Sequence, residues 1–155
     1  MKKRWLLLIP ILFALDRAAK LWAGHVLMEK PGGAMDLIHG VVRLRYVEND
    51  GMAFSLFAGN SLLLVGLTGM IMLAAVLYLL FAKRQYALIS IPLTMVLGGG
   101  LGNLYDRITY GSVIDYIEPL FVRFAVFNLA DIFVVCGAFV CAFGVLRLDA
   151  KGDLR

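Results

Sequence analysis

Three long stretches of apolar sequence constrain this chain more than any other feature. They cover residues 61–82, 86–105 and 124–146, and together they contain one charged side chain, Asp131. A helix of about 20 apolar residues crosses the hydrocarbon core of a bilayer, which is about 30 Å thick. Each stretch is therefore predicted to span a membrane.

The overall composition supports this interpretation. The chain has 155 residues, of which 61% are hydrophobic and 17% charged, whereas soluble domains are about half apolar and about a quarter charged. A domain this small buries only a modest fraction of its surface, so it cannot hide so much apolar area from water. The net charge is +4, but the basic residues form no patch beyond the first few positions. We therefore expect no nucleic-acid partner.

A fourth candidate span covers residues 5–23 and is interrupted by Asp16, Arg17 and Lys20. Its basic start and short apolar core are also typical of a removable secretory signal peptide. The small residues of a cleavage site are missing, because Leu15, Asp16 and Arg17 stand there. We expect the segment to be retained, which predicts an all-α membrane protein of four transmembrane helices. These would form a single domain over residues 1–155.

The orientation follows from the basic residues of the connections. Eight of the 15 Lys and Arg residues lie in the short segments 1–4, 83–85 and 147–155, and the other seven are spread over segments 16–60 and 106–123. Short loops rich in Lys and Arg stay in the cytoplasm. Both termini and the 83–85 turn are therefore predicted to be cytoplasmic, with the two long connections on the outer face.

The first long connection contains a strand pattern. Val42, Leu44 and Tyr46 alternate with two arginines, residues 49–51 form a predicted turn, and residues 52–57 are a predicted returning strand. Such a β-hairpin would lie on the outer membrane surface with its arginines near lipid phosphates. A loop that packs over the bundle with solvated arginines fits the pattern equally well.

Two aspartates in apolar surroundings are candidates for chemistry, because ionisable groups at membrane depth are costly. Asp131 is expected about two turns into the last span, with Asn128 three residues earlier on the same face. Asp115 lies in the apolar run 113–117. If the two carboxylates meet, they share one proton and can hydrolyse a peptide bond by general acid and base catalysis. Alternatively, Asp131 caps a helix or pairs with Arg107.

Further polar groups are expected at the same depth. Asn103 and Arg107 share a helix face at the outer end of the third span, with Asp106 beside them. Asn103 can donate to an oxyanion, and Arg107 can hold a carbonyl, a phosphate or Asp106. Gly98 and Gly102 are four residues apart, a spacing that lets membrane helices approach closely.

Motifs of other hydrolases are missing from the sequence. His25 and His39 do not have the HExxH spacing of zinc proteases, and no serine stands in a Gly-x-Ser-x-Gly elbow. Cys136 and Cys141 are interpreted as packing residues, since five residues along a helix separate them by about 140°.

Four segments, in this order, resemble the bacterial lipoprotein signal peptidase family, also called signal peptidase II. Residues 15–20 resemble its Asp-x-x-x-Lys segment, and residues 49–55 its Asn-x-Gly-Ala-Ala-Phe-Ser motif. Residues 98–107, continuing to Asp115, resemble its Gly-Gly-x-x-Gly-Asn-x-x-Asp-Arg block and the Val-x-Asp-Phe that follows. Residues 127–131 resemble its Phe-Asn-x-Ala-Asp.

The resemblance implies a four-span aspartic peptidase of the bacterial inner membrane with its site at the periplasmic face. Its substrates are prolipoproteins that carry diacylglycerol, and it cleaves just before the lipid-modified cysteine. It implies no metal or organic cofactor and a monomer in the phospholipid bilayer. The implied catalytic residues are Asp115 and Asp131, the implied lining residues are Asn49, Asn103, Arg107 and Asn128, and Asp16 and Lys20 are supporting residues. The hairpin at 42–57 resembles the family's β-cradle.

The sequence departs from the family pattern at four positions, and two other functions stay open. Arg17, Ala19, Met52 and Tyr116 replace commoner residues, and the bulk of Met52 bears on substrate choice. Tyr105 and Asp106 resemble half of the presenilin-like motif of intramembrane aspartyl proteases, but its Gly-x-Gly-Asp half is missing. A proton-coupled carrier would use both aspartates as a relay. It would also need polar groups in the cytoplasmic halves of the spans, which offer nearly none.

Overall fold

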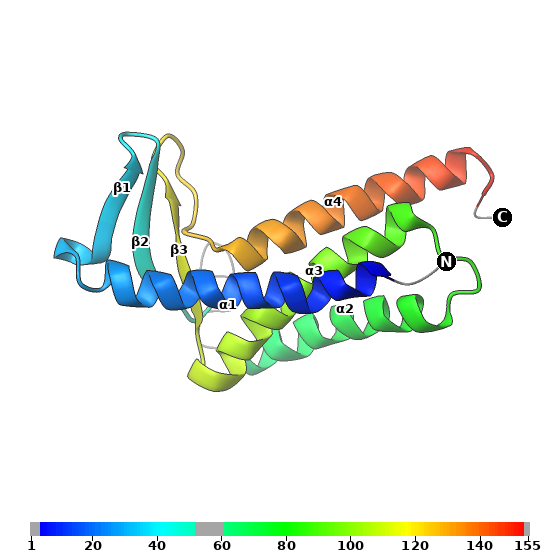
Figure 1. Ribbon diagram of the computed structural model, residues 1–155, viewed down its shortest axis with the longest axis horizontal. Coiled ribbons are helices and arrows are strands. Elements are labelled where there is room, and N and C mark those ends of the chain that lie inside the picture. The colour runs from blue at the N-terminus through cyan, green and yellow to red at the C-terminus, as the bar shows by residue number, and fades with distance from the viewer. Residues whose placement is uncertain (1–3, 52–60, 154–155) are drawn as a thin grey trace.

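The computed structural model describes residues 4–51 and 61–153, and these form four long helices and a small sheet (Figure 1). The helices are α1 (Leu8–Leu27), α2 (Ser61–Phe81), α3 (Ala87–Tyr110) and α4 (Leu129–Ala150). The strands are β1 (Ala34–Ile38), β2 (Val42–Asn49) and β3 (Val113–Pro119). Two short 3-10 helices, η1 (Arg4–Leu7) and η2 (Pro31–Gly33), precede α1 and β1.

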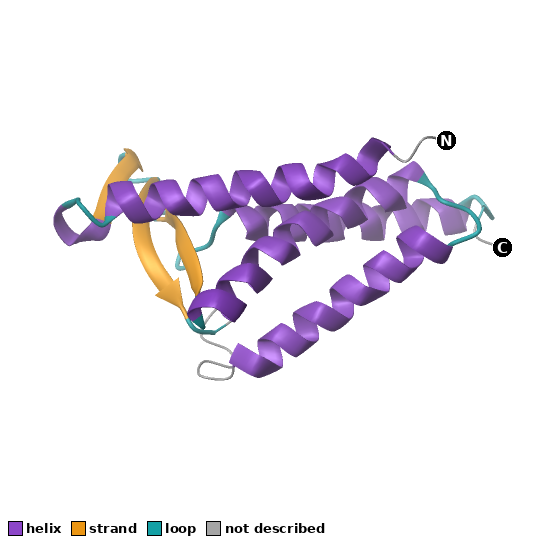
Figure 2. Ribbon diagram, turned by 60° about the horizontal axis from the view of Figure 1, so that its bottom comes forward, coloured by secondary structure: helices purple, strands orange, loops and turns teal. Residues whose placement is uncertain are grey.

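The sheet stands at one end of the helix bundle. The four helices run along the length of the molecule, and all three strands lie at one end of it, beside the last turns of α1 (Figures 1 and 2). The start of α1, the end of α4 and the connection between α2 and α3 lie at the opposite end. The short basic segments thus lie at one end of the bundle and the two long connections at the other, as expected from the sequence.

Three of the helices meet the length and composition of a membrane span: Leu62–Phe81 within α2, and α3 and α4 in full. α1 is as long but carries Asp16, Arg17 and Lys20. The side chains of Asp16 and Lys20 are buried against the bundle, whereas Ile11 and Leu15 are exposed. In its middle, α1 therefore turns Asp16 and Lys20 inward and the apolar side chains of Ile11 and Leu15 outward.

Glycines let α3 pack closely against its neighbours. A methyl group built on Gly98 would lie 2.7 Å from Leu12 Cβ of α1, and one on Gly102 would overlap the Asp16 carboxylate. On the other side, a methyl group on Gly137 of α4 would lie 2.7 Å from the Pro92 carbonyl oxygen of α3. The role expected for Gly98 and Gly102 is confirmed.

The sheet differs from the predicted hairpin. Its order is β1-β2-β3 and both pairings are antiparallel, so β2 has a neighbour on each side. Strand β2 falls on the predicted first strand of the hairpin, while β1 and β3 were not predicted. Residues 52–57 and Met52 among them lie outside the described residues. Leu44 and Tyr116 of the sheet pack on Ala23 and Leu27, near the end of α1.

The last helix begins later than predicted. Residue Phe127 exchanges backbone hydrogen bonds with Ile117 of β3, at 3.0 and 2.8 Å, so the chain is extended there. Asn128 then caps α4, and Asp131 lies in its first turn. The prediction that Asp131 lies two turns into the span was wrong. The apolar run from residue 124 does not show where the helix begins, whereas the Asn128 side chain caps the helix and fixes its first turn.

Close packing of α3 on α4 gives a testable prediction for stability. Gly137→Ala places a methyl group against the backbone oxygen of Pro92, which cannot move away cheaply. We expect it to lower the free energy of unfolding by about 1–3 kcal/mol. Thermal unfolding of the purified protein in detergent measures this. The matched control is Gly66→Ala in α2, where nothing lies within 4 Å of the added methyl group. It should leave the melting temperature unchanged or raise it slightly; equal melting temperatures for the two variants would contradict the packing argument.

Candidate active site

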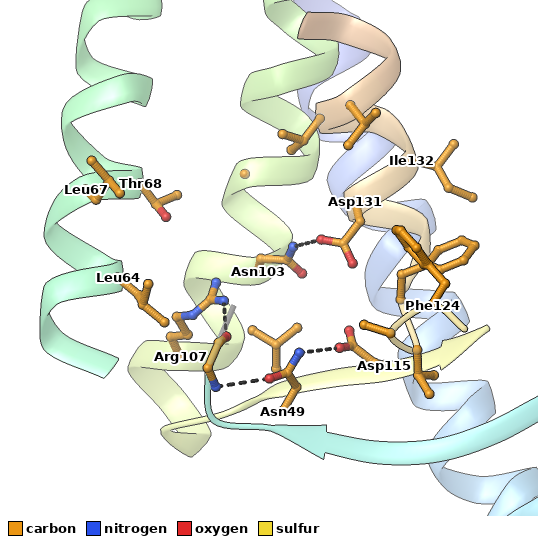
Figure 3. A pocket seen from close by; sticks show the side chains of 18 of the residues that line it. Asn49, Leu64, Leu67, Thr68, Asn103, Arg107, Asp115, Phe124, Asp131 and Ile132 are labelled. Carbon is orange, nitrogen blue, oxygen red and sulfur yellow. Dashed lines mark hydrogen bonds between the residues drawn. The ribbon is translucent and has the colours of Figure 1, made fainter. Parts of the chain in front are cut away.

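Two carboxylates line one cavity where the sheet meets the helices. Asp115 comes from β3 and Asp131 from the first turn of α4. The cavity has a volume of about 540 Å³, and we call it the carboxylate cavity. Figure 3 shows both carboxylates on one side of it, with Asn103 and Asn49 beside them. The pair expected from sequence is therefore brought together.

Strand register positions the Asp115 carboxylate. Asp115 pairs with Val47 of β2, so Asn49, two residues further along β2, is its diagonal neighbour on the same face. Asn49 Nδ2 donates to Asp115 Oδ2 at 2.8 Å, and Asn128 Nδ2 donates to Oδ1 at 2.6 Å. Burial raises the pKa of Asp115 to about 6. The nearby Asp131 charge also raises this pKa, while the hydrogen bonds from both asparagines oppose the rise.

A helix cap positions Asp131. The Asn128 side chain accepts from the Asp131 backbone N–H at 3.0 Å, and Asp131 Oδ2 accepts from the Asn128 N–H at 3.1 Å. Its other oxygen accepts from Asn103 Nδ2 at 2.7 Å. These hydrogen bonds fix the orientation of the Asp131 carboxylate. Asp131 therefore caps its own helix, as one of the alternatives from sequence expected, and it still lines the carboxylate cavity.

Asparagines join the two carboxylates. In the part of the chain that the structure describes, no hydrogen bond runs directly between Asp115 and Asp131. Instead, Asn128 Nδ2 contacts both Asp115 and Asn103 Oδ1, the latter at 3.1 Å, and Asn103 donates onward to Asp131. The relative position of the carboxylates therefore depends on the orientation of two amide side chains.

A buried cluster of charges holds Asn103 in place. The Lys20 ammonium lies 2.7 Å from Asn103 Oδ1, 2.7 Å from Asp106 Oδ2 and 3.1 Å from Asp16 Oδ2. Arg17 completes the cluster with a 2.6 Å contact to Asp106 Oδ1. Because Lys20 donates to the Asn103 oxygen, the amide nitrogen of Asn103 faces Asp131. We call Asp16, Arg17, Lys20 and Asp106 the charge cluster.

Backbone groups attach to the same cluster. Asp16 Oδ1 accepts from the Ala130 N–H at 3.2 Å, and Asp106 Oδ2 accepts from the Ile114 N–H at 3.3 Å. These residues directly precede Asp131 and Asp115 in the chain. The charge cluster thus fixes the backbone next to each carboxylate.

Arg107 lies on the cavity wall, as expected, and its partner there is a backbone carbonyl. Its guanidinium donates to the Gly51 carbonyl oxygen at 3.2 Å, which confirms that it can hold a carbonyl (Figure 3). Of the three partners suggested for Arg107, Asp106 is not the one it binds, since Asp106 pairs with Arg17 and Lys20 of the charge cluster. Neighbouring positions on a helix face different directions. Arg107 also forms no ion pair with Asp131 among the described residues.

The structure places each predicted residue near the carboxylates. Asn49, Asn103, Arg107, Asp115 and Asp131 line the cavity, Asn128 lies buried between them, and Asp16 and Lys20 form part of the layer behind. The contributions of Arg17 and Asp106 to that layer were missed. The charges of α1 could have indicated them. Asp16, Arg17 and Lys20 have a net charge of +1, so burying them together requires a second carboxylate, which Asp106 provides.

The rest of the cavity wall is apolar. Leu64 and Leu67 of α2 face Ile132 and other residues of α4 across the opening (Figure 3). No three His, Cys, Asp or Glu side chains of residues 4–51 and 61–153 converge as a group that holds a metal ion. The site thus combines two carboxylates, amide donors and one guanidinium with an apolar wall.

Sequence comparisons agree with this site. The family model for signal peptidase (SPase) II matches residues 8–147. The lipoprotein signal peptidase of Clostridium acetobutylicum is 34% identical over 96% of this chain and 97% of that protein. That of Clostridium novyi is 37% identical over 86% of this chain and 90% of that protein, and that of Streptococcus pyogenes 32% identical over 99% and 100%.

Solved structures share the fold. One bacterial membrane enzyme superposes with a TM-score of 0.87 over 97% of this chain and 92% of that chain, at 21% identity. Another gives 0.81 over 94% of each chain, at 22% identity. The matched family model runs from the start of α1 to residue 147 near the end of α4 and includes both cavity carboxylates. The chain therefore belongs to the signal peptidase II family.

Proposed function

We propose that this chain is an aspartic endopeptidase that cleaves diacylglyceryl-modified prolipoproteins just before the lipid-bearing cysteine. Family membership makes it a signal peptidase II, an enzyme of lipoprotein maturation. One observation carries the mechanism: Asp115 and Asp131 line a single cavity, and each is held by amide donors. The catalytic roles of these residues are part of the proposal.

The two carboxylates have different surroundings, which suggests different roles. Asp131 receives hydrogen bonds from Asn103 and from a helix N-terminus, so we assign it the role of the general base that takes a proton from water. Asp115 has a pKa of about 6, above that of an ordinary carboxyl group, so it binds a proton more readily and acts as the general acid. It protonates the carbonyl oxygen or the leaving nitrogen, and no covalent intermediate forms.

Membrane placement supports the choice of substrate. α1 has 20 residues, about 30 Å of helix, and its charges are buried, so we propose it as the fourth span. The basic connections at one end assign that end to the cytoplasm of the bacterial inner membrane. The sheet and the carboxylate cavity then lie at the periplasmic face. A substrate whose diacylglyceryl chains stay in the bilayer reaches them there, and a monomer suffices because one chain supplies both aspartates.

The dyad gives a prediction for activity. Asp115→Asn and Asp131→Asn each remove one of the two proton-transferring groups while keeping the size and shape of the side chain. We expect each to lower kcat by at least about a thousandfold, because proton transfer by a positioned group contributes about 10²–10⁴-fold and the pair acts as a unit. The measurement is cleavage of a purified diacylglyceryl-modified prolipoprotein in detergent, followed by mass spectrometry of the products.

The control variant is Asp36→Asn, at an exposed carboxylate of β1 that pairs with Arg43. It should cleave like the wild type. An unlipidated substrate tests the lipid requirement and should stay uncut. Normal cleavage by both cavity variants would exclude the dyad, and equal cleavage of the unlipidated substrate would point to a general membrane protease.

The raised pKa of Asp115 predicts the pH dependence. If Asp115 must be protonated, kcat/KM falls as the pH rises through about 6, because the acid is then lost. Asn49 donates to the ionised form and so lowers this pKa. Asn49→Ala should therefore raise the pKa and move the falling limb to higher pH. The control Glu48→Gln, on the same strand, should leave the limb in place. A limb that rises through pH 6 would assign the base role to Asp115 instead.

A further inference from the structure

The apolar wall of the carboxylate cavity contains one hydroxyl, on Thr68 of α2. Figure 3 shows Thr68 on α2, across the cavity from Asp131. Between residues 62 and 77 of the chain, Thr68 is the only polar residue. Polar side chains inside membrane helices are costly, and they generally face a partner or a cavity where they serve a function. The catalytic proposal makes no use of Thr68, so its hydroxyl is a candidate for a further role.

The Thr68 hydroxyl is not committed to another part of the protein. A threonine within a helix often donates to a carbonyl oxygen one turn earlier. Thr94 of α3 does so, since its Oγ1 donates to the Ile91 carbonyl oxygen at 2.6 Å. Thr68 makes no such bond, and its hydroxyl has no other hydrogen-bond partner in the part of the chain that the structure describes. It can therefore bind a group that enters the cavity.

Helix packing places Thr68 at the depth of the active-site asparagine Asn103. α2 and α3 touch at Met72 and Gly100, because a methyl group built on Gly100 would lie 3.0 Å from the Met72 sulfur. A short turn joins the two helices, so they run antiparallel. Thr68 is four residues before Met72 and Asn103 is three residues after Gly100, so both lie about one turn, or about 5 Å, closer to the outer end. Asn103 donates to Asp131 at this level.

A peptide bound in this cavity needs hydrogen-bond partners for its backbone. The peptide must leave a helical conformation near the scissile bond if both carboxylates are to reach one peptide group, and unpaired peptide groups are costly in apolar surroundings. The amide nitrogens of Asn49, Asn103 and Asn128 each donate already to a carboxylate. On the opposite wall, Thr68 offers an O–H donor that is not engaged. Its natural acceptor is a backbone carbonyl oxygen.

We propose that Thr68 is a substrate-binding residue whose hydroxyl donates to a backbone carbonyl oxygen of the signal peptide, on the membrane side of the scissile bond. This inference rests on the proposed function, because it takes a signal peptide as the substrate. Thr68 lies seven residues, about 10 Å, into α2 from Ser61 and within its apolar span. The part of the substrate at that depth is the signal peptide. A contact to the backbone serves signal peptides of different sequence.

The test measures kcat/KM of the full-length protein in detergent with a diacylglyceryl-modified prolipoprotein. Thr68→Val removes the hydroxyl and keeps the shape of the side chain, so it should lower kcat/KM about three- to tenfold, the usual effect of losing one neutral hydrogen bond. Thr68→Ser keeps the hydroxyl and should stay within about twofold of the wild type. The matched control is Thr109→Val, the same change at an exposed position of α3 outside the cavity lining, and it should leave kcat/KM unchanged.

The other outcomes decide against the proposal. An unchanged kcat/KM for Thr68→Val would exclude the contact, and equal losses for Thr68→Val and Thr68→Ser would assign the effect to packing instead of the hydroxyl. Thermal unfolding checks the folding of each variant, and Thr68→Ala provides a second variant without the hydroxyl if Thr68→Val does not fold. Failure of the proposed function looks different, because the wild type would then leave the lipidated substrate uncut or the dyad variants would still cleave it.

Discussion

The buried ammonium of Lys20 is the contact on which the active-site end of this structure depends. It lies within 3.1 Å of two carboxylates and one amide oxygen, which come from α1 and α3. A charge removed from water requires such compensation, and deleting one partner leaves the others buried and unpaired. The same carboxylates accept from backbone groups beside Asp115 and Asp131. Helix packing and site geometry are therefore linked through one cation.

α3 connects the parts of the molecule. It contacts each of the other three helices, and its residues Asn103, Asp106 and Arg107 reach the carboxylate cavity or the layer behind it. The spacing of these residues turns them toward different partners. Asn103 reaches Asp131, Asp106 reaches α1, and Arg107 reaches Gly51, two residues after β2 ends. A single helix thus aligns a strand, a helix cap and a buried charge cluster.

The sequence allowed the helices, strand β2 and the polar residues around the cavity to be predicted, but not strands β1 and β3. A long apolar segment predicts a membrane span because only lipid can surround so many apolar side chains on one helix. This prediction holds for α2, α3 and α4. The strand β3 was missed because it consists of seven residues whose pairing with β2 joins segments about 70 positions apart. No local pattern encodes that pairing. The same limit applies to Arg17 and Asp106, whose contact depends on how α1 packs against α3.

The two amides that hold Asp115 also limit where its proton can be. A carboxyl group offers about four lone pairs, and Asn49 and Asn128 each occupy one, on different oxygens. An acid hydrogen cannot share a lone pair with an N–H donor, so it must sit on one that points away from both asparagines. Asp115 lines the carboxylate cavity, so in the proposed mechanism its remaining lone pairs are the ones available to a bound peptide. In that mechanism the two asparagines direct the acid proton as well as position the carboxylate.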